Sequence, residues 1–122
     1  MTVALLVAAG ACGALLRYLV DHAVHRRTGP GFPYGTVLIN MTGSFALGFL
    51  VSLAADKGLP ASVLTVGGTG FLGAYTTFST LTFETVSLLE RSRLRPSVSF
   101  LGTSLVTGLG AAALGLALGS VL

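Results

Sequence analysis

Residues 67–80 read GGTGFLGAYTTFST, and this stretch decides what fold the chain can adopt. It holds four glycines, and its second half carries four serine or threonine hydroxyls, although the residues around it are largely apolar. Glycine weakens a helix, and serine and threonine compete for its backbone hydrogen bonds. The stretch therefore predicts a break in a helix, in which free amides and carbonyls can face an ion. The alternative is that the glycines only allow neighbouring helices to pack closely.

The composition of the chain indicates which solvent surrounds it. Of 122 residues, 52% are apolar and only 9% are charged, whereas an average soluble protein has about 25% charged residues. A soluble domain of this size needs charge to cover its surface. We therefore expect most of the chain to lie in lipid. Seven basic residues cannot form a surface that follows phosphates, so the composition excludes a soluble nucleic-acid-binding protein despite an isoelectric point near 9.6.

Four apolar segments are long enough to cross the hydrocarbon core, which takes about 20 residues. They run over about residues 3–20, 34–55, 62–89 and 97–122, and short polar loops separate them. The N-terminus lacks the charged region of a signal peptide, so the first segment is expected to remain as a span. The prediction is an all-α membrane protein with one domain over residues 1–122, four transmembrane helices and a break in the third. Cys12, the single cysteine, is expected to be a small buried apolar residue.

Small residues recur at every fourth position in three of these segments, which is typical of close helix contacts. They are Gly10 and Ala14, then Ser44 and Gly48, then Ala111, Gly115 and Gly119. A chain with four spans can hardly enclose a pore alone, and faces of small residues suit tight association with a second subunit. We therefore expect an oligomer.

Each polar side chain inside a span is a candidate functional group because its burial is costly. Asn40 has a carboxamide that can donate to an anion or clamp a neighbouring helix. Arg17 lies about one turn from the end of its span and either reaches the interface or attracts anions. Glu84 is the only acid within a span, and it can couple protons, bind a cation or pair with Arg17. Phe78 can present a ring edge, which carries partial positive charge, to an anion.

These groups do not have the composition of an enzyme site. No sequence cluster of histidine, cysteine and carboxylate offers metal catalysis, and no nucleophile has a base at a suitable spacing. Weak neutral donors in series can replace the hydration of an ion without holding it tightly, and they suit a small, hard anion. The sequence therefore favours the permeation of an anion over catalysis.

Four stretches of the sequence together form a specific pattern. Its core is the run Thr76, Thr77, Phe78, Ser79 and Thr80, with Asn40 upstream. The other matching positions are Gly10, Gly13, Arg17 and Tyr18; residues 35–40 with Gly43, Ser44, Phe45 and Gly48; Gly70, Phe71 and Gly73; and Glu84. On these residues the chain resembles the Fluc (CrcB) family of small fluoride channels over essentially its whole length.

The resemblance implies four-helix subunits that assemble as an antiparallel dimer, with two fluoride pathways and a sodium ion at the dimer centre. It implies that Asn40 donates its amide to fluoride and that Phe78 presents its ring edge to the ion. It places the backbone carbonyls of Gly73 and Thr76 on the sodium ion. The remaining implied pathway residues are Arg17 near the vestibule, Glu84, the hydroxyls of Thr77, Ser79 and Thr80, and Ser104 or Thr107 in the fourth span. The implied activity is passive export of fluoride across the cell membrane, which lowers fluoride in the cytoplasm.

The sequence departs from the family pattern at one position that matters. The family has a second phenylalanine three residues after the first, whereas this chain has Leu81 there and Phe83 out of register. Leucine lacks the polarised ring edge. The alternative function is therefore a non-conducting or partly degenerate subunit, or a scaffold, of a heterodimeric fluoride channel. Ala74 in place of a common glycine is a milder change.

Charges outside the spans predict the orientation of the chain in the membrane. Five arginines lie in the first and third loops, and one basic residue, Lys57, lies in the second: the arginines are Arg26, Arg27, Arg91, Arg93 and Arg95. By the positive-inside rule, both termini are expected outside, with a single orientation. A chain of fixed orientation cannot form an antiparallel dimer alone. The hypothesis is therefore a homologous, oppositely oriented partner that supplies the missing phenylalanine, with a homodimer as the alternative.

A second class of transporter fits the four-span pattern less well. Small multidrug exporters are also four-span dimers, but they need a carboxylate in the first span to bind cationic drugs. The first span of this chain has Arg17 and no acid. The sequence therefore disfavours a multidrug exporter.

Overall fold

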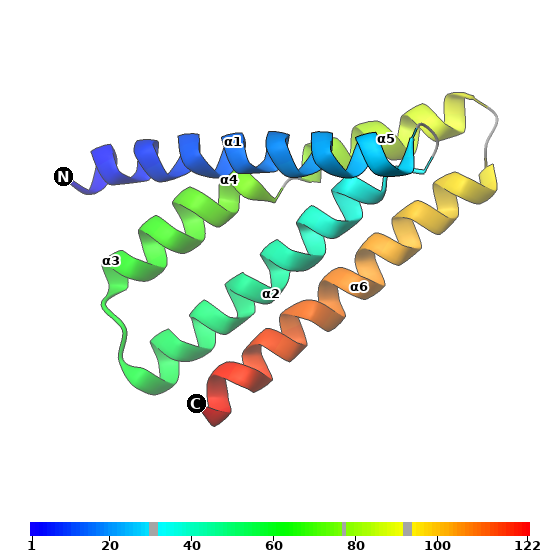
Figure 1. Ribbon diagram of the computed structural model, residues 1–122. Helices are drawn as coiled ribbons and strands as arrows, with labels where there is room; N and C mark the ends of the chain where they lie inside the picture. Colours follow the sequence, from blue (N-terminus) through cyan, green and yellow to red (C-terminus); the bar gives the residue numbers. More distant parts are fainter. Residues whose placement is uncertain (30–31, 77, 92–93) are drawn as a thin grey trace.

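The computed structural model describes residues 1–29, 32–76, 78–91 and 94–122, with the side chains of residues 78–80 left aside, and in these residues all regular structure is helical. Figure 1 shows the helices in an open arrangement in which α2 lies between α1 and α6. The elements in chain order are α1 (Thr2–Thr28), α2 (Tyr34–Lys57), α3 (Ala61–Val63), the π-helix η1 (Leu64–Leu72), α4 (Gly73–Tyr75), α5 (Phe78–Glu90) and α6 (Leu94–Val121).

Three of these helices, α1, α2 and α6, are long and apolar enough to cross a membrane. The chain is therefore a multi-pass membrane protein built of helices, as the composition predicts. The third predicted span is divided among α3, η1, α4 and α5. The longest of these has 13 residues, which is about 20 Å of helix and too short to cross the hydrocarbon core alone.

Two helix boundaries differ from those predicted. The residues after Val20 were expected in a loop, but α1 continues through them to Thr28. It ends at Gly29, whose φ of 76° suits glycine and stops the helix. The helix α6 begins at Leu94, before Pro96, because proline in the first turn lacks only an amide hydrogen that the helix would not use. The predicted helices were too short because their ends were placed where the sequence becomes polar. A helix can continue beyond the lipid into water.

The most extensive helix contact is between α2 and α6. A Cβ at Gly48 would overlap the carbonyl oxygen of Ala112, and a Cβ at Gly115 would overlap that of Phe45. Ser52 donates a hydrogen bond to the carbonyl of Leu116 at 2.8 Å. Backbone thus lies directly against backbone, which confirms that Gly48 and Gly115 are helix contacts.

The helix α1 packs on η1 and α4 in a similar way but over a smaller area. A Cβ at Gly13 would overlap the carbonyl oxygen of Phe71, whereas Gly10 makes only an ordinary contact with Gly70. Cys12 is exposed, so the prediction that it is buried was wrong. Its neighbour Gly13 faces η1, and consecutive residues of a helix point in different directions, so Cys12 lies on the outer side of α1.

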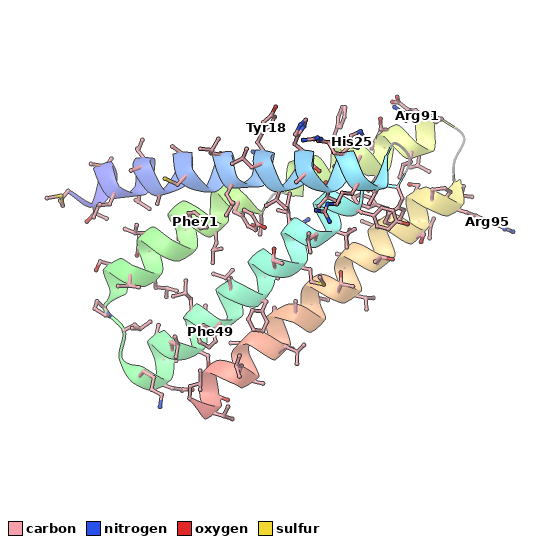
Figure 2. All side chains as sticks on the ribbon, in the orientation of Figure 1. Tyr18, His25, Phe49, Phe71, Arg91 and Arg95 are labelled. Carbon is pink, nitrogen blue, oxygen red and sulfur yellow. The ribbon has the colours of Figure 1, made fainter. Side chains whose placement is uncertain are left out.

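Both ends of the chain lie at one end of the molecule, together with the connection between α2 and α3 (Figure 1). The last turns of α1 and α5 and the first turns of α2 and α6 lie at the opposite end. Figure 2 shows His25, Arg91 and Arg95 at that opposite end. Two of the arginines that the charge pattern assigned to one side of the membrane, Arg91 and Arg95, therefore lie at one end of the fold, and Arg93 lies outside the described residues.

Candidate functional site

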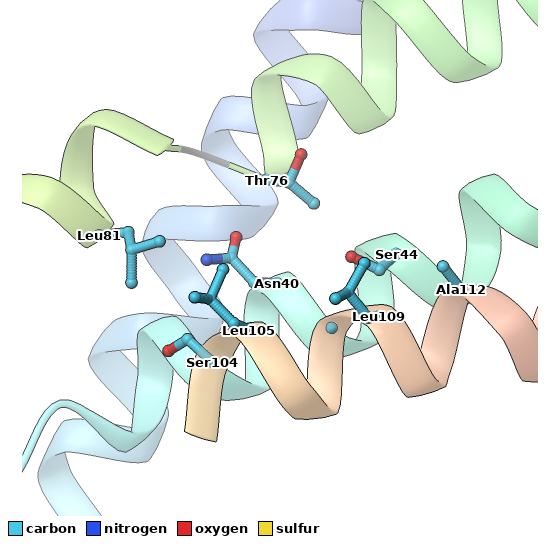
Figure 3. Close-up of a pocket in the computed structure, with 9 residues that line it drawn as sticks. Asn40, Ser44, Thr76, Leu81, Ser104, Leu105, Leu109 and Ala112 are labelled. Carbon is cyan, nitrogen blue, oxygen red and sulfur yellow. The ribbon is translucent and has the colours of Figure 1, made fainter. Parts of the chain in front are cut away.

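An open pocket of about 290 Å³ lies where α2 and α6 meet the junction of α4 and α5 (Figure 3). Three predicted site residues line it, namely Asn40, Thr76 and Ser104, and so does Leu81, the residue that departs from the family pattern. The full lining is Asn40, Ser44, Thr76, Leu81, Ser104, Leu105, Gly108, Leu109 and Ala112. Its walls are mainly apolar, and its polar atoms come from neutral side chains.

Helical periodicity brings the pocket's residues together. On α2, Asn40 and Ser44 are four residues apart and therefore share a face. On α6, Ser104, Gly108 and Ala112 share a face in the same way. Gly108 lies opposite Ser44, since a Cβ at Gly108 would be 3.7 Å from the Ser44 Oγ, an ordinary contact distance. The close packing of α2 on α6 thus places the two polar faces opposite each other.

Ser104 is a buried polar residue of the pocket. Ser104 is 4% exposed, and its Oγ has no hydrogen-bond partner in the described part of the chain. Thr107, the other candidate on this helix, instead donates to the carbonyl of Thr103 at 2.6 Å and does not line the pocket. A buried hydroxyl without a partner costs roughly 1–3 kcal/mol. Ser104 therefore has a donor available for a ligand, and Thr107 does not.

The backbone leaves helical geometry at Thr76, which has φ −81° and ψ 153°. Its amide and its side-chain hydroxyl both donate to the carbonyl of Leu72 at 2.9 Å. The carbonyls of Gly73 to Thr76 belong to the last turn of the helix that ends there. At a helix end, the last carbonyls have no i+4 amide within the helix to donate to them. Gly73 itself is exposed, and a Cβ there would meet only the Gly68 oxygen at 3.7 Å, so its carbonyl rather than its size is the feature of interest.

Leu81 closes one side of the pocket and belongs to a small apolar core. It is 5% exposed and packs with Leu88 and Phe100. Figure 3 shows Leu81 beside the carboxamide of Asn40. The position where the family pattern has a phenylalanine is therefore next to Asn40, and the apolar side chain there offers no ring edge.

Two further predicted residues lie away from this pocket. Glu84 accepts a short hydrogen bond from Thr36, which is 2% exposed. Glu84 lines a second open pocket of about 310 Å³ with Asp21, His25 and Arg91. This pocket lies at the end of the molecule opposite the two termini (Figure 2). Arg17 on α1 is half-buried and lines neither of these two pockets.

Four predicted pathway residues fall where the side chains are not described. They are Thr77, which lies outside the described residues, and Phe78, Ser79 and Thr80, for which the structure describes only the helical backbone of α5. Their roles stay predictions. Among the residues that are described, no group of three or more histidine, cysteine, aspartate or glutamate side chains is placed to hold a metal ion.

Two polar residues of α2 were not singled out from the sequence as site residues. Ser44 was assigned to helix packing, but it lines the pocket with Asn40. Thr36 was included only in a matching stretch, but it is the partner of Glu84. Both lie four residues from Asn40, one on each side. Helical spacing alone therefore contained the signal that places all three on one face.

Comparison with known proteins gives a consistent result. The family model "CrcB-like protein, Camphor Resistance (CrcB)" matches residues 4–116. A Mycobacterium tuberculosis protein named "Fluoride-specific ion channel FluC 2" is 47% identical over 106 residues, which cover 87% of this chain and 81% of that protein. The Agrobacterium fabrum "Fluoride-specific ion channel FluC" is 43% identical over 98% of this chain and 96% of its own. The Listeria monocytogenes "Fluoride-specific ion channel FluC 1" is 48% identical over 89% of each chain.

Proposed function

The chain belongs to the CrcB-like family, a family of fluoride channels and not of enzymes, and we propose that it is a subunit of a channel that exports fluoride passively from the cytoplasm. The choice of fluoride as the ion comes from the names of the relatives. The residues of the pocket supply a chemical reason why this chain suits it.

The observation that carries the proposal is the hydroxyl of Ser104, which has no hydrogen-bond partner among the described residues and lies in the pocket that Asn40 also lines. Fluoride is small and strongly hydrated, so a site that passes it must replace water with several hydrogen-bond donors. A hydroxyl and a carboxamide can donate without a full positive charge, which would trap the ion. The apolar remainder of the lining lowers the local dielectric constant, which strengthens each donation.

We propose that α3, η1, α4 and α5 together make a fourth membrane crossing that is broken at Thr76. Support comes from the path of these four elements. It runs from the end of the molecule where the two termini lie to the opposite end (Figure 1). Non-helical backbone at membrane depth is tolerated where protein buries it or a cavity adjoins it. Thr76 meets this condition because it lines the pocket.

The same break suits a sodium ion held by backbone oxygens. The carbonyls of Gly73 and Thr76 lie at the end of a helix, where the partial charge is negative and regular donors are lacking. Helix ends and unwound carbonyls of this kind bind sodium in other membrane proteins. A sodium ion there would fix the broken segments and add positive charge near the anion path. We assign it a structural role at the centre of a dimer.

The partner subunit is proposed to lie antiparallel to this one in the cell membrane. The arginine-bearing ends of α1, α5 and α6 would face the cytoplasm, with both termini outside. A single orientation requires a second, oppositely oriented homologous chain. Leu81 beside Asn40 supports this heterodimer, because the partner can supply the ring that this pocket lacks.

The same position favours a second candidate function. In this alternative, a subunit with leucine at this place conducts nothing through its own pocket and serves only to complete its partner's pathway. This alternative predicts no flux from the chain alone and restored flux with a homologous partner. A homodimer that conducts by itself excludes it.

Fluoride efflux from liposomes tests these proposals directly. The chain is reconstituted alone and with a homologous partner, and efflux is followed with a fluoride electrode. The Asn40→Asp variant replaces the carboxamide donors by acceptors of the same shape and adds a negative charge that repels the anion. We expect at least a hundredfold loss of flux, since several kcal/mol of repulsion oppose entry. Unaltered flux would remove Asn40 from the path.

Orientation has its own test. A cysteine introduced at Arg91, in a Cys12→Ala background, is labelled by an impermeant maleimide from one side of intact cells and then after lysis. Protection in intact cells is expected. Labelling of the protein from both sides of the membrane would contradict the proposal of a single orientation.

A further inference from the structure

The turn of the backbone at Thr76 is packed directly against α2. A Cβ at Gly43 would overlap the Cγ2 methyl of Thr76 and would lie 3.2 Å from the ring of Tyr75. Gly43 is buried, and Tyr75 is 7% exposed. The missing side chain at Gly43 therefore makes the space in which this turn sits.

A hydrogen bond joins the same two segments. The hydroxyls of Tyr75 and Thr42 are 2.9 Å apart. Thr42 Oγ1 also lies 2.8 Å from the carbonyl of Leu38, so its single proton is used within α2. With the Thr42 proton on Leu38, Tyr75 is the donor to Thr42, although the distance alone allows either hydroxyl to donate. The tyrosine hydroxyl is consequently occupied and is not a donor for a passing ion.

The opposite side of this segment is held by α1 and by a ring contact. The Phe71 and Tyr75 rings stack with their centroids 6.3 Å apart. The carbonyl of Phe71 lies against Gly13, and a Cβ at Gly13 would be 3.2 Å from the amide nitrogen of Tyr75. The segment is therefore confined between α1 and α2, and Tyr75 is its anchor.

We propose that Gly43, Thr42 and Tyr75 are positioning residues that hold the turn at Thr76 in the geometry needed for permeation. We assign them no contact with either fluoride or sodium. They act through Thr76, whose side chain lines the pocket and whose carbonyl we assigned to sodium. This inference rests on the proposed function for its effect on flux, but the packing that it describes can be measured separately.

A pair of variants isolates the contact. Gly43→Ala places a methyl against the Thr76 methyl, so the Thr76 side chain or the turn must move, and we expect at least a tenfold loss of fluoride flux and a lower melting temperature. Thr76→Ser removes the opposing methyl and keeps the hydroxyl that bonds Leu72. The double variant should recover most of the flux and of the melting temperature. Thr76→Ser alone is measured as the reference for the double variant.

The matched control is Gly48→Ala on the same helix. Its new Cβ would overlap the backbone oxygen of Ala112, which no side-chain truncation can relieve. Thr76→Ser should therefore not rescue it. The proposal is overturned if Thr76→Ser fails to rescue Gly43→Ala, or if it rescues Gly48→Ala equally.

A second pair tests the hydrogen bond even if Gly43→Ala does not fold. Tyr75→Phe keeps the stacked ring and removes the donor, whereas Tyr18→Phe alters an exposed tyrosine of α1 that is 65% exposed. A neutral hydrogen bond corresponds to about a fivefold change in an equilibrium constant. We expect Tyr75→Phe, but not Tyr18→Phe, to raise the sodium concentration for half-maximal flux about fivefold.

The two proposals fail in different ways. If the wild-type chain carries no fluoride with any partner, the proposed function fails, and the rescue of the melting temperature still decides whether the contact exists. If the wild type conducts and Tyr75→Phe has an unchanged sodium dependence and flux, the positioning role of Tyr75 is wrong.

Discussion

The two faces of α2 show two different uses of the same residue type. Toward α6, Gly48 meets a backbone carbonyl, and no neighbouring atom can move away without moving a helix. Toward the broken segment, Gly43 meets a methyl group and an aromatic ring, which are side-chain atoms. The first face joins two continuous helices into a scaffold. The second supports a backbone turn beside an open pocket.

This difference indicates where the molecule tolerates change. Backbone-to-backbone contacts have no adjustable part, so a substitution there acts on the whole fold. Contacts made by side-chain atoms can be compensated by a second substitution. The polar groups of the pocket lie between these two regions, which places a weakly satisfied site on a rigid support.

The largest effect is expected when the scaffold face is broken. Gly115→Ala would overlap the carbonyl of Phe45 and bring a methyl to 2.8 Å from the amide nitrogen of Phe49. We expect a loss of roughly 3 kcal/mol of stability, measured as thermal or denaturant unfolding in detergent. Gly110→Ala, on the same helix with nothing within 4 Å, is the control and should be neutral or slightly stabilising. Equal losses in both variants would show that helix propensity, and not close packing, is being measured.

A smaller loss is expected from the polar link between α2 and α5. Thr36→Val keeps the shape of the side chain and removes the donor to Glu84. A half-buried carboxylate that loses its donor should cost about 1–2 kcal/mol of stability in the same assay. Thr28→Val removes an exposed hydroxyl that bonds only its own helix and should change little. If the two variants unfold alike, the Thr36 bond does not stabilise the fold.

Ser104→Ala should separate function from stability. Its hydroxyl has no partner among the described residues, so its removal should leave the unfolding free energy within about 0.5 kcal/mol of wild type or raise it. Fluoride efflux should nevertheless fall about tenfold, because one donor of the path is lost. Ser120→Ala, at the exposed end of the same helix, should keep wild-type flux. A destabilised Ser104→Ala protein with normal flux would make the hydroxyl a structural group.

The smallest effect is expected at Leu81. Leu81→Phe places a ring beside Asn40 in the pocket, and we expect the flux of the chain alone to rise about twofold. The gain is small because the residue is 5% exposed and the larger side chain must be accommodated. The assay is liposome efflux without a partner. A flux that falls with unchanged stability would show that leucine is the residue that this pocket requires.

The sequence was sufficient for the parts of the fold that depend on local composition. The apolar runs predicted α1, α2 and α6, whereas the break predicted in the third span stays a prediction. Helix ends were less predictable, because α1 extends into residues whose polarity suggested a loop. Burial of Cys12 was predicted wrongly because it depends on which face of α1 meets η1.

The candidate site was predictable residue by residue but not as an assembly. Asn40, Thr76 and Ser104 were each singled out from the sequence, and the structure places all three around one pocket. That Glu84 pairs with Thr36, 48 positions away, depends on how α2 and α5 pack, which no local pattern encodes. The pairing of Gly48 with Ala112 and of Gly43 with Thr76 has the same origin.

The position of the two termini limits how this protein can be rebuilt. Because both leave the molecule at the same end, a short peptide that joins two copies head to tail gives a tandem protein whose halves point the same way (Figure 1). A single polypeptide with opposed halves needs a linker that itself traverses the bilayer once more. Such a linker requires about 20 apolar residues. Gene fusion of this chain to an opposed copy is therefore a problem of membrane topology and not of linker flexibility.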